Sequence, residues 1–295
     1  MYHHTLLSLV WLGLVPGSFA QYASTKVVLD PTYGTVAPPH DAFPQNPEHV
    51  RVVSNVLIVI ILAFVGISLL ESKRWSSTLP AALTIGSATF TLAEAINCYL
   101  GSVYWTTSHD SSKLLFVLLG RDFEVYVVLV WWSYAAVTSC MVFGALNRNI
   151  GPGRLWALLA FAAFLDIVLE EIVLTLGGVY HYYGHQPLVF NIFPLWWCFC
   201  NVSSIFVGIS VVYRYRHLLE GWRSCLIPII LPLCYVGPQV LAGLPTMYAI
   251  QADYSPLVTQ LCGLLTCMLA VVQVGVVMDT FLGRDPTCST HQKLL

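Results

Sequence analysis

Long apolar runs alternate with short polar connectors along most of this chain. Each run holds close to the 20 or so residues that an α-helix needs to cross the apolar core of a bilayer, which is about 30 Å thick. The pattern therefore predicts an all-α, polytopic membrane bundle of seven transmembrane helices. We expect these helices at Val52–Leu70, Pro80–Leu100, Phe123–Leu146, Leu155–Leu176, Phe190–Tyr213, Cys225–Leu244 and Pro256–Leu282.

The composition agrees with a multi-pass integral membrane protein. Of the 295 residues, 57% are hydrophobic and only 9% are charged, whereas a soluble protein carries about 25% charged residues. A net charge of −2 gives no basic surface for nucleic acid. The nine cysteines lack paired metal-ligand spacing, so neither a disulfide framework nor a metal is expected. The expected partners are the lipid bilayer and a lipophilic small molecule, and the oligomeric state stays open.

The two ends of the chain differ from the apolar runs. Leu6–Val15 is a short apolar core, and Ser18 and Ala20 form a small-x-small cleavage site, which is typical of a signal peptide or of an uncleaved anchor. The proline-rich segment that follows is typical of a flexible arm. We therefore expect a signal peptide at 1–20, a lumenal flexible arm at 21–51, the seven-helix transmembrane domain at 52–283 and a short cytoplasmic tail at 284–295.

The distribution of basic residues predicts the orientation in the membrane. With the N-terminus outside or lumenal and the C-terminus cytoplasmic, nine Lys and Arg residues fall on the inner side and four on the outer side. This bias obeys the positive-inside rule. The apolar segment Leu114–Gly120 is too short to span, and we interpret it as an interfacial or re-entrant piece.

Acidic residues inside the apolar runs are the candidate functional groups. Glu94 lies in the second predicted span, and Asp166, Glu170 and Glu171 lie in the fourth. A charged residue at the centre of a membrane helix costs about 2.5–3.5 kcal/mol, so such residues normally face a cavity or a partner. Asp166 and Glu170 are four residues apart and share one helix face. Glu171 points about 100° away from Glu170, and its alternative role is to satisfy a hydrogen bond of a neighbour.

Further polar and aromatic side chains fall at compatible depths in the outer half of the bundle. The aromatic residues also suit the ordinary interfacial belt of a membrane protein, so their role stays open at this point. We expect the three acids Glu94, Asp166 and Glu170 to be catalytic, and we expect the pocket to be lined by Asn97, Trp132, Tyr180, Trp196, Trp197 and Asn201.

An apolar pocket with carboxyl groups favours chemistry that begins with protonation. Burial disfavours the charged form of a carboxyl group, and two neighbouring acids disfavour it further, so such a group can act as a general acid. Protonation of an isoprenoid alkene or epoxide makes a carbocation, which aromatic faces stabilise. The chain lacks a diphosphate–magnesium motif, a GxSxG elbow, a zinc helix, a P-loop and a nicotinamide fingerprint. We therefore expect no cofactor.

The layout resembles the small integral-membrane terpene cyclases of fungal meroterpenoid biosynthesis, in particular the ascochlorin and ascofuranone type. The likeness rests on size, on the seven predicted spans and on the acids Glu94, Asp166 and Glu170; Ala93 stands where related cyclases have the Trp of a WE-type motif. It implies a cofactor-independent cyclase, of isomerase or lyase type, in secondary-metabolite biosynthesis. A fainter resemblance, through the same acids and Gly178–Tyr182, is to membrane carotenoid hydratases.

Two other classes of protein share part of this pattern. A proton-coupled small-molecule transporter would use Asp166 and Glu170 as a proton relay. A seven-helix receptor would also have an outside N-terminus, but the third and seventh predicted spans lack the DRY and NPxxY motifs. The endoplasmic reticulum or another endomembrane is the expected location.

Overall fold

The computed structural model of the chain describes residue 36 and residues 44–252 and 254–282. The predicted signal peptide at 1–20, most of the predicted arm and the predicted tail at 284–295 lie outside the described residues. The first helix of the described residues begins at Pro47, inside the segment that was predicted to be a flexible arm. Asn46 starts this helix, because its side chain accepts hydrogen bonds from the backbone N–H groups of Glu48 and His49.

The described part of the chain is mostly helical, and a 3-10 turn at Ser87–Thr89 joins two of the helices into one continuous rod. The final turn, Val277–Leu282, is a π-helix. The helices are α3 (Pro47–Trp75), α4 (Leu79–Gly86), α5 (Phe90–Gly101), α6 (Val125–Asn147), α7 (Pro152–Leu176), α8 (Trp196–Arg214), α9 (Arg216–Leu219), α10 (Ile227–Gln251) and α11 (Pro256–Val276).

Six of these rods are long and apolar enough to cross a membrane. They are α3, the continuous rod of α4 and α5 (Leu79–Gly101), α6, α8, the rod Gly221–Gln251 and the helix Pro256–Thr280. The rod Gly221–Gln251 consists of a 3-10 turn, Gly221–Leu226, followed by α10, and Pro256–Thr280 consists of α11 and most of the π-helical turn after it. The remaining long helix, α7, has 25 residues but carries Asp166, Glu170 and Glu171, and it is not among the six. The chain is thus a multi-pass membrane protein.

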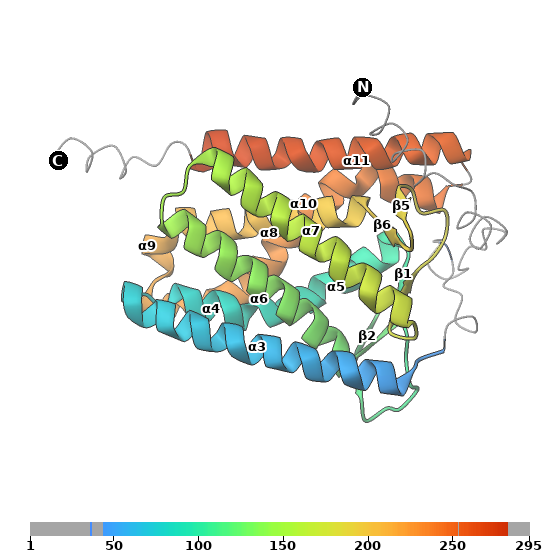
Figure 1. The fold of residues 1–295 in the computed structure, drawn as a ribbon, viewed down its shortest axis with the longest axis horizontal. Coiled ribbons are helices and arrows are strands. Elements are labelled where there is room, and N and C mark those ends of the chain that lie inside the picture. Colours follow the sequence, from blue (N-terminus) through green and yellow to red (C-terminus); the bar gives the residue numbers. More distant parts are fainter. Residues whose placement is uncertain (1–35, 37–43, 253, 283–295) are drawn as a thin grey trace, which may run out of the picture.

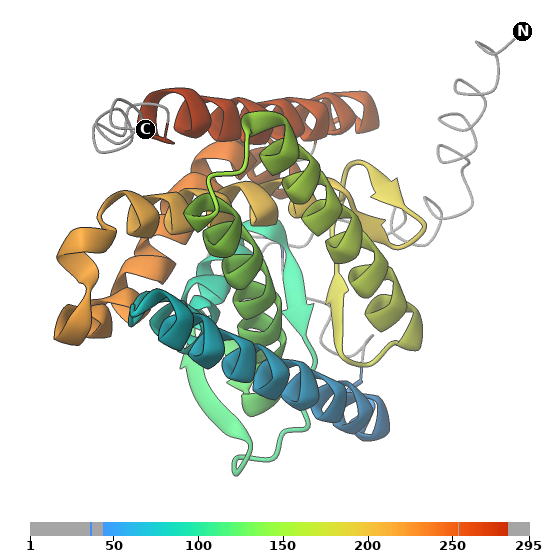
Figure 2. The ribbon, with the colours of Figure 1, turned by 60° about the vertical axis from the view of Figure 1, so that its left-hand side comes forward.

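The helices pack around α8, which lies at the centre of the bundle. In α8, 83% of the most apolar stretch is buried, against 17% in α3 and 28% in α11. α10 packs on α8, α11 and α5, whereas α3 packs on α6 and α4. Figure 1 shows α3 and α11 on opposite sides of the molecule, with α6, α7 and α8 between them. Figure 2 gives the same arrangement after rotation, with α6 and α7 toward the viewer.

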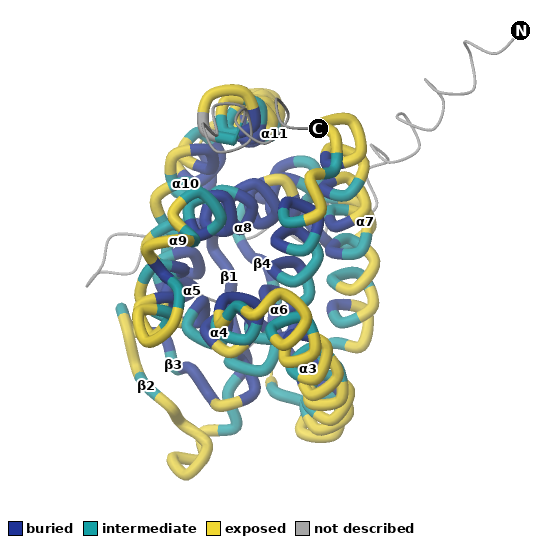
Figure 3. The backbone as a smooth tube through the Cα atoms, turned by 90° about the vertical axis from the view of Figure 1, so that its left-hand side faces the viewer, coloured by how far each residue is buried: buried dark blue, intermediate teal, exposed yellow. Residues whose placement is uncertain are grey.

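The periphery of the bundle is apolar and exposed. Figure 3 shows exposed residues along the outer faces of α3, α7 and α11 and buried residues at the centre. Outward-facing aliphatic and aromatic side chains cover these faces, since water is not their solvent in a bilayer. Examples on α3, α7, α10 and α11 are Val59, Leu62, Phe164, Ile172, Leu233, Leu241, Leu257 and Met268.

Three short antiparallel ribbons gather at one end of the bundle (Figure 1). Two of the three include positions that the hydrophobic pattern assigned to membrane segments. The predicted interfacial piece Leu114–Gly120 forms the first strand and turn of a hairpin. The predicted start of the fifth span, from Phe190, is instead part of a small hairpin before α8. The pairs are β1 (Val103–Trp105) with β4 (Tyr180–Tyr182), β2 (Leu114–Leu118) with β3 (Arg121–Glu124), and β5 (Val189–Phe190) with β6 (Phe193–Pro194).

Candidate active site

A cavity of about 350 Å³ lies between α3, α6 and α7, with α5, α8 and the β1–β4 ribbon closing its inner end. This volume is at the lower end of the range for small-molecule sites. Aliphatic side chains form more than half of its wall, and the other lining residues are polar or aromatic. The polar and aromatic residues in its wall are Glu94, Trp105, Trp131, Ser133, Tyr134, Thr138, Asp166, Glu170, Tyr180, Tyr182, Trp197 and Asn201.

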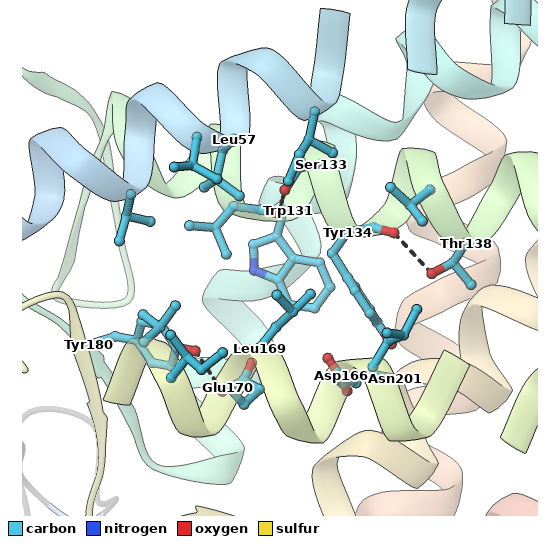
Figure 4. Close-up of a pocket in the computed structure, with 18 of the residues that line it drawn as sticks. Leu57, Trp131, Ser133, Tyr134, Thr138, Asp166, Leu169, Glu170, Tyr180 and Asn201 are labelled. Atoms are coloured by element: carbon cyan, nitrogen blue, oxygen red, sulfur yellow. Dashed lines mark hydrogen bonds between the residues drawn. The ribbon is translucent and has the colours of Figure 1, made fainter. Parts of the chain in front are cut away.

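The cavity reaches the molecular surface between α3 and α7. Val52 and Val56 of α3 and Leu169 and Ile172 of α7 line it, and the same four side chains are exposed on the outside of the bundle. Both helices pack on α6, and Figure 4 shows Leu57 of α3 and Leu169 of α7 on opposite sides of the space. The opening is therefore aliphatic and faces the direction in which lipid would lie.

Glu94 stands on α5 at the inner wall and is held by one carboxyl oxygen. Its side chain is 3% exposed. Oε1 accepts hydrogen bonds from Trp105 Nε1 at 3.0 Å and from Cys98 Sγ at 3.2 Å. Oε2 is buried and has no hydrogen-bond partner among the described residues. One oxygen thus fixes the orientation of the carboxyl group, and the other is left for a ligand or a proton.

Asp166 faces the cavity from α7, and its side chain is 3% exposed. Its Oδ2 accepts a hydrogen bond from Asn201 Nδ2 of α8 at 3.3 Å. Asn201 lines the same cavity. Figure 4 shows Asp166 and Asn201 side by side, below the ring of Tyr134, which points toward them from α6.

Glu170 stands one helical turn beyond Asp166 on the same face of α7. Its Oε2 accepts hydrogen bonds from the hydroxyl of Tyr180 at 2.6 Å and from the hydroxyl of Tyr182 at 3.1 Å. Burial, followed by the charge of Glu170, raises the pKa of Tyr180 and of Tyr182 well above the ordinary tyrosine value. Both hydroxyls therefore keep their protons, and they donate to Glu170.

Aromatic rings form a continuous surface beside the three acids. The ring centroids of Trp105 and Tyr180 are 4.5 Å apart, and those of Tyr182 and Trp197 are 5.8 Å apart. The β1–β4 ribbon makes this possible, since its register pairs Trp105 with Tyr180. Two segments far apart in the sequence thus bring their aromatic side chains to one wall of the cavity.

Several buried polar atoms of this wall have no hydrogen-bond partner among the described residues. They are Oε2 of Glu94, the hydroxyl of Tyr134 and the indole nitrogens of Trp131 and Trp197. Buried polar groups in native proteins are normally paired, so such a cluster calls for an explanation. Its position around one cavity fits a site that supplies hydrogen-bond donors and acceptors to a bound molecule.

Three residues that were predicted to line the pocket do not line this cavity. Trp132 turns toward α4, where its Nε1 donates to the carbonyl of Thr84 at 2.8 Å. Trp196 is fully buried, and its Nε1 donates to Gln186 Oε1 at 3.1 Å. Asn97 is fully buried on α5, outside the cavity wall, and its amide has no partner among the described residues.

The remaining predicted residues lie together. Glu94, Asp166 and Glu170 line one cavity with Tyr180, Trp197 and Asn201. The prediction did not include Trp105, Trp131 or Tyr182 among the pocket residues. Trp131 is the neighbour of Trp132, and Tyr182 follows Tyr180 on the same face of a strand, so the period-2 alternation of a strand was the indication for Tyr182.

Two other acids have structural roles near the site. Glu171 accepts hydrogen bonds from the backbone N–H groups of Ile192 and Phe193 and from Asn191 Nδ2, so it holds the β5–β6 hairpin. Glu124 binds the loop before β2. Burial acts to raise the pKa of Glu124. Hydrogen bonds from Gln45 and Ser108 outweigh burial and lower this pKa below its usual value.

The described residues hold no cluster of three His, Cys, Asp or Glu side chains that could bind a metal ion. The cysteines from Cys98 to Cys267 are free thiols. Comparisons of the chain with protein-family models, with curated proteins and with solved structures found no match.

Proposed function

We propose that this protein is a membrane-bound, cofactor-independent terpene cyclase that protonates an isoprenoid alkene or epoxide on a prenylated, meroterpenoid substrate. The observation that carries the proposal is the meeting of Glu94, Asp166 and Glu170 in one apolar cavity with an aromatic wall. Acids in such a cavity are costly, and three of them at one site indicate use in chemistry or transport.

The reaction begins with Asp166 or Glu170 as the general acid. The carboxyl proton moves to the epoxide oxygen or to an alkene carbon, and the carbon–oxygen bond or the π-bond opens to leave a carbocation. A second double bond of the chain attacks this cation and closes a ring. Glu94, whose Oε2 has no partner, then removes a proton from the carbon next to the final cation. The product is an isomer of the substrate, and proton exchange among the acids restores the starting state.

The cavity wall suits a cationic intermediate. Aromatic faces attract a cation, by about 0.5 kcal/mol when exposed and by about 2 kcal/mol or more when desolvated. Trp105, Trp131, Trp197 and Tyr180 supply such faces close to the acids. The scarcity of polar wall groups suppresses early capture of the cation by water.

The surroundings support access from the membrane. We propose that α7 is the seventh span, with the strand-bearing end of the bundle lumenal. Seven Lys and Arg residues of the described chain lie at the opposite end, and three lie at or near the strand-bearing end, as the positive-inside rule expects. A lipophilic substrate would then pass between α3 and α7 directly from an endomembrane, such as that of the endoplasmic reticulum.

The test is product analysis of membranes that contain the protein. Microsomes would be incubated with prenylated phenol epoxides without metal or nucleotide, and the products would be analysed by mass spectrometry. A cyclised isomer of unchanged mass is expected, whereas the gain of one water would indicate a hydratase. No conversion of any substrate by the folded protein would contradict the proposal and favour a proton-coupled transporter, which proton-linked uptake into vesicles would detect, or a receptor.

Isosteric variants identify the acids that carry the reaction. Asp166→Asn and Glu170→Gln cannot donate a proton at neutral pH, and loss of a general acid costs about 10²–10⁴-fold in rate. Glu171→Gln is the matched control, because Glu171 lies next to Glu170 but binds the β5–β6 hairpin. Full activity of both Asp166→Asn and Glu170→Gln would exclude this mechanism even for a genuine cyclase.

A further inference from the structure

A chain of buried hydrogen bonds leads from α8 and α10 to Asp166. Ser204 Oγ donates to Gln239 Oε1 at 3.0 Å, and Gln239 Nε2 donates to Asn201 Oδ1 at 3.2 Å. Asn201 Nδ2 then donates to Asp166 Oδ2 at 3.3 Å. All four side chains are buried, and Ser204 and Gln239 lie outside the cavity wall.

The chain has a direction. A serine hydroxyl can rotate, but an amide has a carbonyl that only accepts and an NH₂ group that only donates. Because Gln239 Oε1 accepts from Ser204, its NH₂ group faces Asn201. Asn201 Oδ1 also accepts from the hydroxyl of Tyr235 at 3.0 Å. Two donors thus point at the carbonyl of Asn201, and its NH₂ group faces Asp166.

Reversing either amide would bring like groups together in a buried place. A flipped Asn201 would point its NH₂ group at the NH₂ group of Gln239 and its carbonyl at Oδ2 of Asp166. A buried donor or acceptor that loses its partner is costly, so reversal of one amide alone is disfavoured. Neither amide therefore reverses alone, and the residues that couple them, Ser204, Tyr235 and Gln239, lie outside the cavity wall.

We propose that Asn201 is a positioning residue that reserves Oδ2 of Asp166 as a hydrogen-bond acceptor and so keeps the acidic proton on Oδ1. This inference rests on the proposed function, in which Asp166 is a proton donor. Oδ1 makes no hydrogen bond with a described residue, and Asp166 lines the cavity. The proton is thus presented toward the bound molecule rather than toward α8.

The chain cannot itself supply the proton. Every bond in it points toward Asp166, and the two amide NH₂ groups do not give up protons under ordinary conditions. Asp166 must then regain its proton from the cavity side, where Glu170 stands one turn away with the hydroxyls of Tyr180 and Tyr182. The amide chain orients the acid, and the carboxyl groups of α7 exchange its proton.

Infrared spectroscopy of the reconstituted protein tests this without any substrate. The carbonyl band of protonated Asp166 is identified as the band that Asp166→Asn removes. Asn201→Leu deletes the donor to Oδ2, so the band should move to higher wavenumber. Ser204→Ala removes only the first bond of the chain, and it should broaden or split the band as Asn201 gains a second orientation.

The matched control is Ser203→Ala. Ser203 is buried beside Ser204 on α8, but its hydroxyl donates to the carbonyl of Cys200 and is not part of the chain. The Asp166 carbonyl band of the Ser203→Ala variant should coincide with that of the unmodified protein. If Ser204→Ala behaved like Ser203→Ala, the inference would be overturned, even where Asn201→Leu failed to fold.

Kinetics supply the second readout. Asn201→Leu should lower kcat by about tenfold or more, and Ser204→Ala by about two- to fivefold, with KM nearly unchanged, because a positioning bond acts on the reacting state. A rise in KM at constant kcat would assign Asn201 to substrate binding instead. A shifted band without turnover of any substrate would contradict the proposed function and leave the orientation of Asp166 supported.

Discussion

The two tyrosine hydroxyls that meet at Glu170 give this carboxyl group its orientation. The bond from Tyr180 is 2.6 Å long and that from Tyr182 is 3.1 Å. We expect Tyr180→Phe to lower kcat by about five- to tenfold and Tyr182→Phe by less, since one hydrogen bond contributes about 0.5–1.5 kcal/mol. Steady-state rates of product formation measure this.

The control for these variants is Tyr248→Phe. Tyr248 is exposed on α10 and does not line the cavity, so its loss of a hydroxyl should leave the rate unchanged. A stronger effect of Tyr182→Phe than of Tyr180→Phe would mean that the ribbon shifts when substrate binds.

At the scale of single residues, the sequence identifies the acids better than the aromatic groups around them. Asp166 and Glu170 stand out because a carboxyl group in an apolar helix has few tolerable environments. Trp131 and Trp132 are equally apolar neighbours about 100° apart on one helix. Only the packing of α6 against α3 and α4 decides that Trp131 faces the cavity and Trp132 does not.

Among the helices, α3 and α7 form the opening of the cavity, and this opening can be narrowed. Ile60 of α3 lines the cavity, whereas its neighbour Val59 is exposed and does not. Ile60→Trp should therefore raise KM or lower kcat/KM for bulky substrates more than for small ones, because the larger side chain obstructs the space between the helices. The measurement is kcat/KM across substrates of increasing chain length.

Val59→Trp is the matched control for the opening. It adds the same side chain one residue away, on the lipid-facing side of α3, and it should leave the substrate series unchanged. Equal effects of the two variants would mean that substrate does not pass between α3 and α7.

The β1–β4 ribbon carries a titratable group, and its stability should depend on pH. Burial lowers the pKa of His181 from 6.5 to about 4. An opened ribbon would bind a proton below about pH 6.5 that the closed ribbon does not bind. The contribution of neutral His181 to the stability of the closed ribbon is therefore fully present above about pH 6.5, and it is lost as the pH falls toward 4.

Hydrogen exchange of the amides in β1 and β4, corrected for intrinsic rates, measures this effect. The ratio of the exchange rate at pH 5 to that at pH 7 should be larger in the unmodified protein than in a His181→Gln variant, because glutamine cannot titrate at that position. The same pH dependence in both proteins would assign the effect to another group.

At the element scale, the helices follow from the apolar pattern and the strands do not. The predicted spans match the helices to within a few residues at most ends, because long apolar runs have few alternatives in a bilayer. The β2–β3 hairpin turns at Leu119 and Gly120, both with positive φ. Leucine at such a position gives none of the Asn-Gly or Asp-Gly cues that announce a tight hairpin turn.

For the whole molecule, the order of helices in the chain does not disclose their arrangement in space. The central position of α8 depends on small and polar residues, such as Ser204 and Ser210, that allow close packing on α10 and α11. The most apolar stretch of α8 is less hydrophobic than those of the outer helices α3 and α11, but this difference does not indicate which helices pack beside α8. The cavity arises because α3 and α7 lie apart on α6, a distance that no local pattern encodes.

Whether α7 crosses the membrane decides whether the cavity is a membrane site. Two cysteines, one before α7 in the chain and one after it, can test this. Between Ser112 in the loop before β2 and the exposed Cys225 lie α6, α7 and α8. Three crossings put these positions on opposite sides of the membrane, whereas two put them on the same side. In a Cys288→Ser background, a membrane-impermeant maleimide applied to sealed microsomes should label Cys225 but not Ser112→Cys. A permeant maleimide should label both, and equal impermeant labelling would mean that α7 does not span.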